Sequence, residues 1–195
     1  MEWARSRPTE AAGWLLGEYD AAAEPEVRAR LREALLETVV GEHQRKEGKG
    51  YVGISMLPTQ IVIPGGEELG AGVRIRVVQP DTPASRAELK VGDVIIALNG
   101  RRWGLDLDTV QDSFMDAVKD LKPGSEVEFE VLRGGELLKV PLTLAARPMG
   151  LPERTRELFW PDLVPEELDL KELERQAKDA FFERWLAEER ARGSK

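Results

Sequence analysis

The residues able to carry acid–base or nucleophilic chemistry are few and poorly spaced for it. The one histidine, His43, lies near the end of a charged helical pattern, which favours a solvated or dipole-complementing role over a catalytic base. Ser55 follows Gly53 and Ile54, but the nucleophile-elbow motif requires a second glycine after the serine. Counting serine and lysine residues leaves a serine–lysine pair open. We therefore expect no catalytic residues and no enzymatic activity.

Acidic and glycine-rich stretches also have structural explanations. Asp106, Asp108 and Asp112 lie where a helix is expected to begin, and negative charge is favoured there electrostatically. No spaced set of histidine, aspartate and glutamate suggests a metal site. The glycines of Pro64–Gly72 are not followed by the lysine and serine or threonine of a phosphate-binding loop. We expect neither a metal nor a cofactor.

Composition excludes further classes of function. The chain has 195 residues, a net charge of -8 and no cysteine, so a nucleic-acid footprint is disfavoured and disulfides are impossible. No apolar run approaches the length of a membrane span, and the amino-terminal sequence lacks the apolar core of a secretory signal. A soluble protein is expected, and the sequence leaves open whether a signal was removed from a longer precursor.

The stretch Val73–Gly100 predicts the elements that organise the chain. From Val73 to Val77, apolar residues alternate with arginines, which is the period of a half-buried strand. Pro83–Leu89 is expected to form a short helix, because proline is tolerated in a first helical turn. The apolar run Val94–Leu98 is expected to be a buried strand, and the Asn-Gly dipeptide after it favours a tight turn.

Strands are also expected before and after this stretch. A strand is predicted from Tyr51 to Met56, with Pro58 ending it, and a second short strand is predicted over Gln60–Ile63. The glycine-rich segment Pro64–Gly72 is expected to be a loop. Alternating apolar residues on both sides of Gly134-Gly135 predict a closing hairpin.

The segment Leu107–Leu121 is expected to be a helix with one apolar face. Val110, Phe114, Val118 and Leu121 recur at spacings of four, four and three residues, which places them on that face.

Taken in order, these features resemble the centre of a bacterial PDZ domain. PDZ domains are the peptide-binding modules attached to high-temperature-requirement and tail-specific serine proteases. The pattern is a strand, Pro-Ala, a short helix, Leu-Lys-x-Gly-Asp-Val-Ile and Asn-Gly. Gly50–Ile54 is similar to the carboxylate-binding loop of the family, and Leu121–Gly124 to the end of its groove helix. The similarity covers roughly Gly48–Arg147 and departs from the family at Glu88, where glycine is common.

The resemblance implies a site for a peptide. A peptide that adds to an exposed sheet edge gains main-chain hydrogen bonds, and a neighbouring helix supplies pockets for its side chains. Backbone N–H groups of Val52, Gly53 and Ile54 would converge on a terminal carboxylate, and the apolar pocket would prefer an aliphatic or small aromatic last residue. The implied peptide-binding residues are Tyr51, Val52, Gly53, Ile54, Met56, Val110, Phe114 and Val118.

The same residues have a simpler interpretation. Val52, Ile54, Phe114 and Val118 have the types and spacings of an ordinary core, which their pattern alone favours, and the ordered PDZ-like context reverses that preference. Gly53 alone is more typical of a bulge than of an anion site. Tyr51 could cover the loop or stack on the preceding helix.

Helices are expected on both flanks of this domain. A first helix from about Thr9 is followed by a stronger one from Pro25, in which Val27, Leu31, Leu35 and Val39 recur at helical spacing. At the carboxyl end, Pro152–Trp160 and Glu166–Arg192 are expected to be helical. The last helix has an apolar stripe of Leu170, Leu173, Ala177, Phe181 and Trp185. These apolar faces should pack on each other or on another copy.

The expected fold class is α+β. It comprises a single PDZ-like, partly open β-barrel or sandwich with two helices, flanked by amino- and carboxyl-terminal helical extensions. The expected parts are an amino-terminal helical extension (1–47), the PDZ-like domain (48–148) and a carboxyl-terminal helical extension (149–195).

The function that these expectations favour is non-catalytic binding of hydrophobic carboxyl termini or extended segments. The expected partners are therefore protein carboxyl termini or extended peptides, with a possible homo-oligomer formed through the flanking helices. The alternatives are a helix-mediated assembly module and an adaptor or regulatory subunit of a separate protease. Family resemblance points to the bacterial envelope or periplasm as the location.

Overall fold

The computed structural model describes residues 8–62, 69–151 and 170–193. The chain divides into two compact units. A helical unit comprises Met1–Glu47 with Pro148–Lys195, and a β unit comprises Gly48–Arg147. The two expected helical extensions therefore belong to one unit. In the described part of the chain, no helix is both long enough and apolar enough to cross a membrane.

The β unit is built on a six-stranded sheet of order β2-β3-β4-β6-β7, in which β5 also pairs with β4. All of its pairings are antiparallel. A separate pair joins β1 to β8. The strands are β1 (Gly50–Tyr51), β2 (Ile54–Val62), β3 (Leu69–Val78), β4 (Val94–Leu98), β5 (Arg101–Arg102), β6 (Glu126–Arg133), β7 (Glu136–Thr143) and β8 (Ala145–Ala146).

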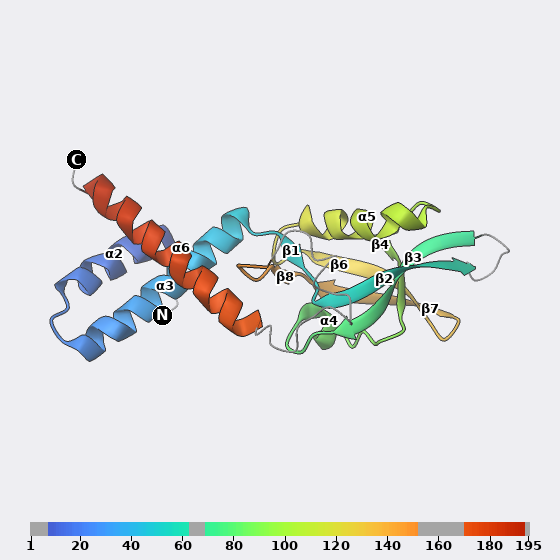
Figure 1. Ribbon diagram of the computed structural model, residues 1–195, viewed down its shortest axis with the longest axis horizontal. Coiled ribbons are helices and arrows are strands. Elements are labelled where there is room, and N and C mark those ends of the chain that lie inside the picture. The colour runs from blue at the N-terminus through green and yellow to red at the C-terminus, as the bar shows by residue number, and fades with distance from the viewer. Residues whose placement is uncertain (1–7, 63–68, 152–169, 194–195) are drawn as a thin grey trace. The chain divides into compact units, whose positions relative to one another are not determined.

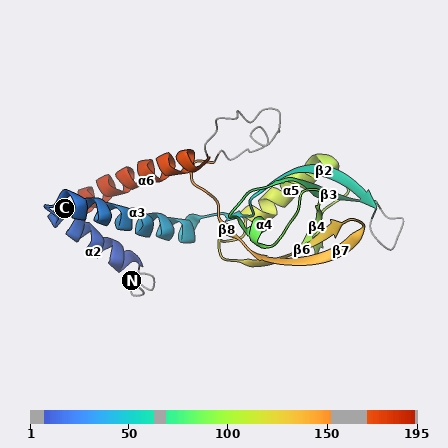
Figure 2. The ribbon, with the colours of Figure 1, turned by 90° about the horizontal axis from the view of Figure 1, so that it is seen from below.

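Two helices complete the β unit. Helix α4 (Pro83–Arg86) begins with proline, and the Thr82 hydroxyl caps it by accepting a hydrogen bond from the Ser85 N–H. Helix α5 (Leu107–Lys119) is capped by Asp106, whose carboxylate accepts from the Asp108 N–H at 2.9 Å. The helix predicted over Leu107–Leu121 is confirmed, although it ends at Lys119, and its buried face is formed by Val110, Phe114 and Val118. Figures 1 and 2 show α5 lying alongside β2 and β3.

Turn chemistry closes both hairpins as the sequence predicts. Asn99 and Gly100 have φ of 50° and 76°, and Gly134 and Gly135 have φ of 60° and 90°. Positive φ at both central residues is the geometry of a type I′ turn, whose twist matches that of the flanking strands.

Several sequence-based bounds of the first strands are wrong. Pro58 does not end a strand, because β2 continues through it from Ile54 to Val62 and includes residues 60–62 of the separate strand predicted over 60–63, whose last residue lies outside the described residues. Proline is tolerated in a strand at the edge of a sheet, where its missing N–H deprives no neighbour of a hydrogen bond. The predicted loop 64–72 is likewise too long, because β3 already begins at Leu69.

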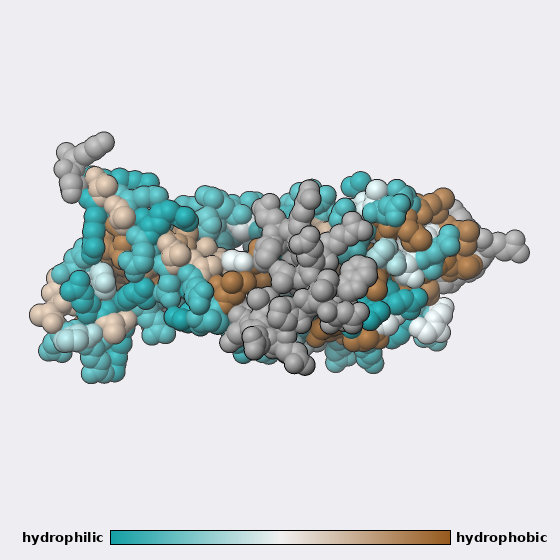
Figure 3. All heavy atoms as spheres, viewed as in Figure 1, coloured by the Kyte–Doolittle hydropathy of each residue, from teal (hydrophilic) through white to brown (hydrophobic). Residues whose placement is uncertain are grey.

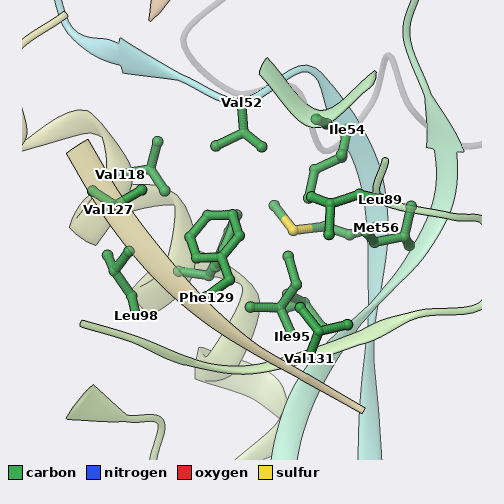
Figure 4. Close-up of a cluster of buried hydrophobic side chains, with 14 of the residues drawn as sticks. Val52, Ile54, Met56, Leu89, Ile95, Leu98, Val118, Val127, Phe129 and Val131 are labelled. Carbon is green, nitrogen blue, oxygen red and sulfur yellow. The ribbon is translucent and has the colours of Figure 1, made fainter. Parts of the chain in front are cut away.

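The core of the β unit lies between the sheet and α5. Figure 4 shows side chains from β2, β4, β6, α5 and the connecting loops converging on one apolar cluster. It includes Val52, Ile54, Met56, Leu89, Ile95, Leu98, Val110, Phe114, Val118, Val127, Phe129 and Val131. The predicted α+β class, with a partly open sheet flanked by helices, is confirmed.

The helical unit contains α2 (Pro8–Ala21), α3 (Pro25–Glu47) and α6 (Leu170–Gly193). Figure 1 shows α6 crossing α3. The three helices share an apolar cluster of Ala12, Leu15, Leu35, Val39, Phe182 and Leu186. The expectation that the flanking helices pack on each other is therefore confirmed. Within α6 the most buried aromatic is Phe182, one position after the predicted Phe181, which is partly buried against the cluster. The predicted helix at 152–160 and the start of the one predicted from Glu166 lie outside the described residues.

Polar contacts join the helices around this cluster. The Arg32 guanidinium binds Asp179 and Glu183 of α6 at 3.0 and 3.2 Å and lies over the Phe182 ring. The hydrogen bond to Asp179 raises the pKa of Arg32 above its ordinary value despite some burial. Arg190 binds Asp20 of α2 at 2.6 Å. Figure 3 shows hydrophilic residues over most of the visible face of this unit.

Candidate functional site

Strand β2 forms one end of the six-stranded sheet. It pairs with β3, and among the described residues no strand pairs with its other side. A sheet edge presents unpaired N–H and C=O groups that can pair with another chain. Because α5 contacts both β2 and β3, this edge lies next to a helix (Figure 1).

Hydrogen bonds identify which β2 residues face the open edge. The Gly53 carbonyl accepts from the Gln79 N–H at 2.9 Å, so the main-chain carbonyl of Gly53 points toward the end of β3. Ile75, the β3 partner of Met56, directs its own N–H and C=O to Asp93 and Gly92 on its other side. Because main-chain groups alternate in direction along a strand, Ile54, Met56 and Pro58 face outward. Pro58 is therefore placed where its missing donor leaves the β2–β3 ladder intact.

The loop before β2 is held from one side through its carbonyl groups. The Val52 carbonyl accepts from the Ala84 N–H at 2.9 Å, and the Gly53 carbonyl from Gln79. Among the described residues, the N–H groups of Val52 and Gly53 form no backbone hydrogen bond. Two donors in a loop beside an open edge are suited to an anionic acceptor.

Gly53 is required by this geometry on two counts. Its φ of 89° is a conformation that side chains disfavour, and a Cβ there would overlap the side chain of Thr82. Thr82 is fixed in turn, because its hydroxyl donates to the Gln79 carbonyl at 2.7 Å while capping α4. The start of α4 thus determines the path of the loop.

Tyr51 supports the same loop. It pairs with Ala145 in β1–β8, and its hydroxyl donates to the Gln79 side-chain oxygen. Gln79 therefore contacts the loop through its side chain at Tyr51 and through its backbone at Gly53. Tyr51 is half-buried against this turn.

The structure brings the apolar candidates together as one buried layer. Val52, Ile54 and Met56 on the β2 side lie in one cluster with Val118 of α5 (Figure 4). The same cluster contains Val110 and Phe114 of α5. Each is at most 9% exposed, so all six serve as core residues in this conformation. Leu57, Met115 and Ala117 on the same two elements are half-buried.

Sequence reasoning missed an ion pair between the buried Asp93 and Arg133 of β6. Both Asp93 oxygens accept from Arg133 at 2.7 Å, and the Lys90 N–H donates to the same carboxylate at 2.8 Å. Burial by itself raises the pKa of Asp93, but the hydrogen bonds from Arg133 and Lys90 outweigh it and hold that pKa below its ordinary value. Arg133 lies 40 residues from Asp93, so no local pattern in the sequence indicated the pair.

The described residues offer no alternative site for catalysis by a metal. They contain no group of three or more histidine, aspartate or glutamate side chains that could hold a metal ion. His43 lies in the helical unit, where its ring contacts that of Phe181 with 4.6 Å between centroids and it pairs with Glu47 at 3.8 Å.

Comparison with known proteins identifies the class. Residues 50–144 match the PDZ domain family. Together with the edge strand, the loop and α5, this match shows that the β unit is a PDZ domain, as the sequence predicted.

Similar proteins include two bacterial proteases. The chain is 38% identical over 79 residues to the serine protease Do-like HtrB of Bacillus subtilis, covering 40% of this chain and 16% of that protein. It is 32% identical over 124 residues to a probable periplasmic serine endoprotease DegP-like of Ectopseudomonas mendocina, covering 61% of this chain and 24% of that protein. The chain thus spans less than a quarter of the length of either relative.

A solved PDZ structure is also similar. The HtrA3 PDZ domain bound to a phage-derived ligand is 25% identical, with 51% of this chain and 88% of that chain covered and a TM-score of 0.40.

Proposed function

We propose that this protein binds the carboxyl-terminal segment of other proteins, which adds as a strand to the open edge of β2. The observation that carries the proposal is the outward direction of the main-chain groups of Ile54 and Met56 at a sheet edge next to α5. Strand addition supplies main-chain hydrogen bonds whatever the peptide sequence, which suits a binding protein with many partners.

The carboxylate would bind at the loop before β2. The N–H groups of Val52 and Gly53 lack backbone partners among the described residues. Together with the N–H group of Ile54, they would donate hydrogen bonds to the carboxylate of the peptide. Hydrogen bonds to a charged acceptor are roughly twice as strong as neutral ones, so the terminal charge would contribute strongly to affinity. A peptide bound there would run antiparallel to β2, with its last residue opposite Ile54.

Side-chain selection would come from the apolar layer between β2 and α5. Val52, Ile54, Phe114 and Val118 are buried without a peptide, so a last side chain would have to displace core contacts or move α5 slightly away from β2. An aliphatic or small aromatic side chain replaces the lost apolar contacts, whereas a charged one would be desolvated without a partner. Met56 and Val110 would contact residues further from the terminus.

Pro58 limits the length of the paired segment. Beyond Met56, the next outward-facing position of β2 is Pro58, which has no N–H to donate. The added strand would therefore exchange hydrogen bonds with Ile54 and Met56. Beyond Met56, no N–H of Pro58 would help to fix the register of the peptide on β2. Recognition would concentrate on the last four or so residues of a partner.

The wider role follows as part of the same proposal. We propose a non-catalytic adaptor that presents carboxyl termini to a separate protein, because the family match and the open edge of β2 both lie in the PDZ unit. The name of one relative places it in the periplasm, and we propose the bacterial envelope as the location here.

Peptide binding with free and blocked termini tests the proposal. Peptides ending in valine with a free carboxylate should bind at least about tenfold tighter than the same peptides with an amidated terminus, because the amide leaves the loop donors without a charged acceptor. Isothermal titration calorimetry on the full chain measures this ratio. Equal or negligible binding of the two forms would refute the carboxylate site.

Assembly through the helical unit remains the alternative from a different class. Light scattering on the full chain and on residues 48–147 separates it from peptide capture. A monomer in both samples would count against assembly.

A further inference from the structure

Two arginines of β3 lie on the sheet face opposite the core. Val73 and Ile75 are fully buried, so the alternation along β3 directs Arg74 and Arg76 to the other face, where both are exposed. This is also the face to which Ser55 and Leu57 of β2 point, because Leu57 pairs with Arg74 and the intervening Met56 belongs to the core.

Arg74 reaches across to the edge strand. Its guanidinium lies 3.5 Å from the Thr59 hydroxyl of β2 and 3.4 Å from the Gly92 carbonyl. Neither contact is with a charged group. The positive charge of Arg74 therefore lies between Thr59 of the edge strand and Gly92.

A register shift between Ser55 and Met56 places Arg76 next to Val77 in a bulge of β3. A bulged residue has no partner directly opposite, and the exposure of Arg76 shows that its side chain still reaches solvent. Among the described residues, neither Arg74 nor Arg76 forms an ion pair with a carboxylate. Two exposed cations thus lie on β3, the strand next to the edge strand.

From this placement we infer that the protein selects peptides with acidic residues at the second and fourth positions from the carboxyl terminus. The inference rests on the proposed strand addition. With the last residue opposite Ile54, the second-last lies beside Ser55 and the fourth-last beside Leu57. Both side chains then point to the face of Arg76 and Arg74, away from α5. Neighbouring strands are about 4.8 Å apart, so a long arginine side chain spans the one intervening strand.

The preference is local and opposes the overall charge. The net charge of -8 repels acidic peptides at long range, where salt screens the interaction. An acidic residue far from both arginines therefore gains nothing. The selectivity depends on position, and position is what the experiment must vary.

Three peptides of equal length, all ending in a free valine carboxylate, separate local from global charge. The first has Glu at the second and fourth positions from the end, and the second has Gln at both. The third has Gln at both and two Glu residues more than six positions from the end, so its net charge equals that of the first. The first should bind the full chain about fivefold tighter than either of the others, as expected for two exposed ion pairs.

Substitutions then identify the arginines responsible. In Arg74→Gln and Arg76→Gln together, the first two peptides should bind equally. Arg101→Gln and Arg102→Gln together remove the same charge from exposed residues of β5, which pairs with β4 only, and should leave the fivefold ratio unchanged. Circular dichroism spectra verify that both variants are folded.

The outcomes distinguish this inference from the function on which it rests. Equal binding of the first and second peptides to the unsubstituted protein, with amidation still weakening binding at least about tenfold, overturns the acidic preference and leaves the proposed function standing. A ratio that survives loss of Arg74 and Arg76 also overturns it. Absence of binding by every peptide refutes the proposed function, and the inference with it.

Discussion

Glu88 has a left-handed backbone, with φ of 56°, at the end of the turn that follows α4. A side chain in this conformation costs about 1–2 kcal/mol, which glycine avoids at a smaller entropic cost in the unfolded chain. The Glu88 carbonyl is needed, because it accepts from Arg133 at 3.0 Å, but that group survives any substitution. Glutamate at position 88, where related domains commonly have glycine, therefore strains the backbone locally and leaves the fold intact.

We predict that Glu88→Gly raises the free energy of unfolding by about 0.5–1 kcal/mol. The matched control is Ala87→Gly at the adjacent residue, whose φ of -84° suits alanine, so glycine there should lower stability by a similar amount. Urea unfolding of both variants provides the comparison. A less stable Glu88→Gly would show that the carboxylate of Glu88 contributes more than its backbone costs.

The Asp93–Arg133 pair predicts a dependence of stability on pH. The folded-state pKa of Asp93 lies below its ordinary value of 3.8, so the pair contributes fully above that value and its contribution is lost as pH falls through the lower folded pKa. Replacing Arg133 by Met leaves a carboxylate that is 2% exposed without its cation, and should cost about 3 kcal/mol at neutral pH.

In Arg133→Met, Asp93 keeps the hydrogen bond from the Lys90 N–H but loses the guanidinium that lowers its pKa, so that pKa should rise. The variant should therefore lose less stability relative to the native protein as pH falls toward 4. Urea unfolding at several pH values measures this convergence. The control is Lys139→Met, which breaks an exposed pair with Glu128 and should have a much smaller effect. A penalty for Arg133→Met that is independent of pH would mean that packing of the arginine stem, not charge, accounts for it.

At the scale of elements, β2 acts through the alternation of its main chain. Its outward groups at Ile54 and Met56 define which N–H groups of an added peptide point toward the sheet. In the proposed register, the third-last peptide residue lies opposite Met56 and exchanges both main-chain hydrogen bonds with it, whereas the N–H of the fourth-last residue points away.

Methylation of single peptide nitrogens should therefore alternate in effect. N-methylation of the third-last residue should weaken binding by about 2 kcal/mol, or roughly thirtyfold, because a hydrogen bond is lost and the Met56 carbonyl is left unpaired. N-methylation of the fourth-last residue should change affinity little. Calorimetry with the two modified peptides measures the contrast, and equal losses would argue against antiparallel pairing in this register.

Much of this architecture follows from short-range sequence signals. Asn99-Gly100 predicted its turn because positive φ at two successive residues favours that dipeptide. The spacing of Val110, Phe114 and Val118 predicted α5 and its buried face. The strand end predicted at Pro58 was wrong, because the position of a strand within its sheet depends on partners distant in sequence. The sequence alone could not show that β2 is an edge strand.

The candidate site was less accessible to sequence reasoning. The apolar pattern of Val52, Ile54, Phe114 and Val118 fits both a core and a peptide pocket, and their burial satisfies both interpretations. What distinguishes the site is main-chain direction, which the residue types do not encode. The loop of the site is also held by contacts between residues that are distant in sequence, such as the contact of the Thr82 side chain with Gly53.

At the scale of the whole molecule, the two units have separate cores. The helical unit is centred on Leu35 and Phe182, both fully buried, and the PDZ unit on the layer between its sheet and α5. Every residue to which we assign a part in peptide recognition belongs to the PDZ unit. Peptide affinity and the integrity of the helical unit should therefore be separable.

Phe182→Ala tests this separation. Removing a fully buried phenylalanine should destabilise the helical unit by about 3–5 kcal/mol, because a cavity is left between α3 and α6. Val27→Ala on α3 is the control, since Val27 is 44% exposed and its loss should cost little. Thermal unfolding followed by circular dichroism measures the first effect, and calorimetry with a valine-terminated peptide measures affinity.

Under the peptide-capture proposal, Phe182→Ala lowers helical stability and leaves affinity within about twofold of the unsubstituted protein. If affinity falls in parallel with helical order while Val27→Ala binds normally, the helices take part in recognition, and the assembly alternative becomes the better account of this protein.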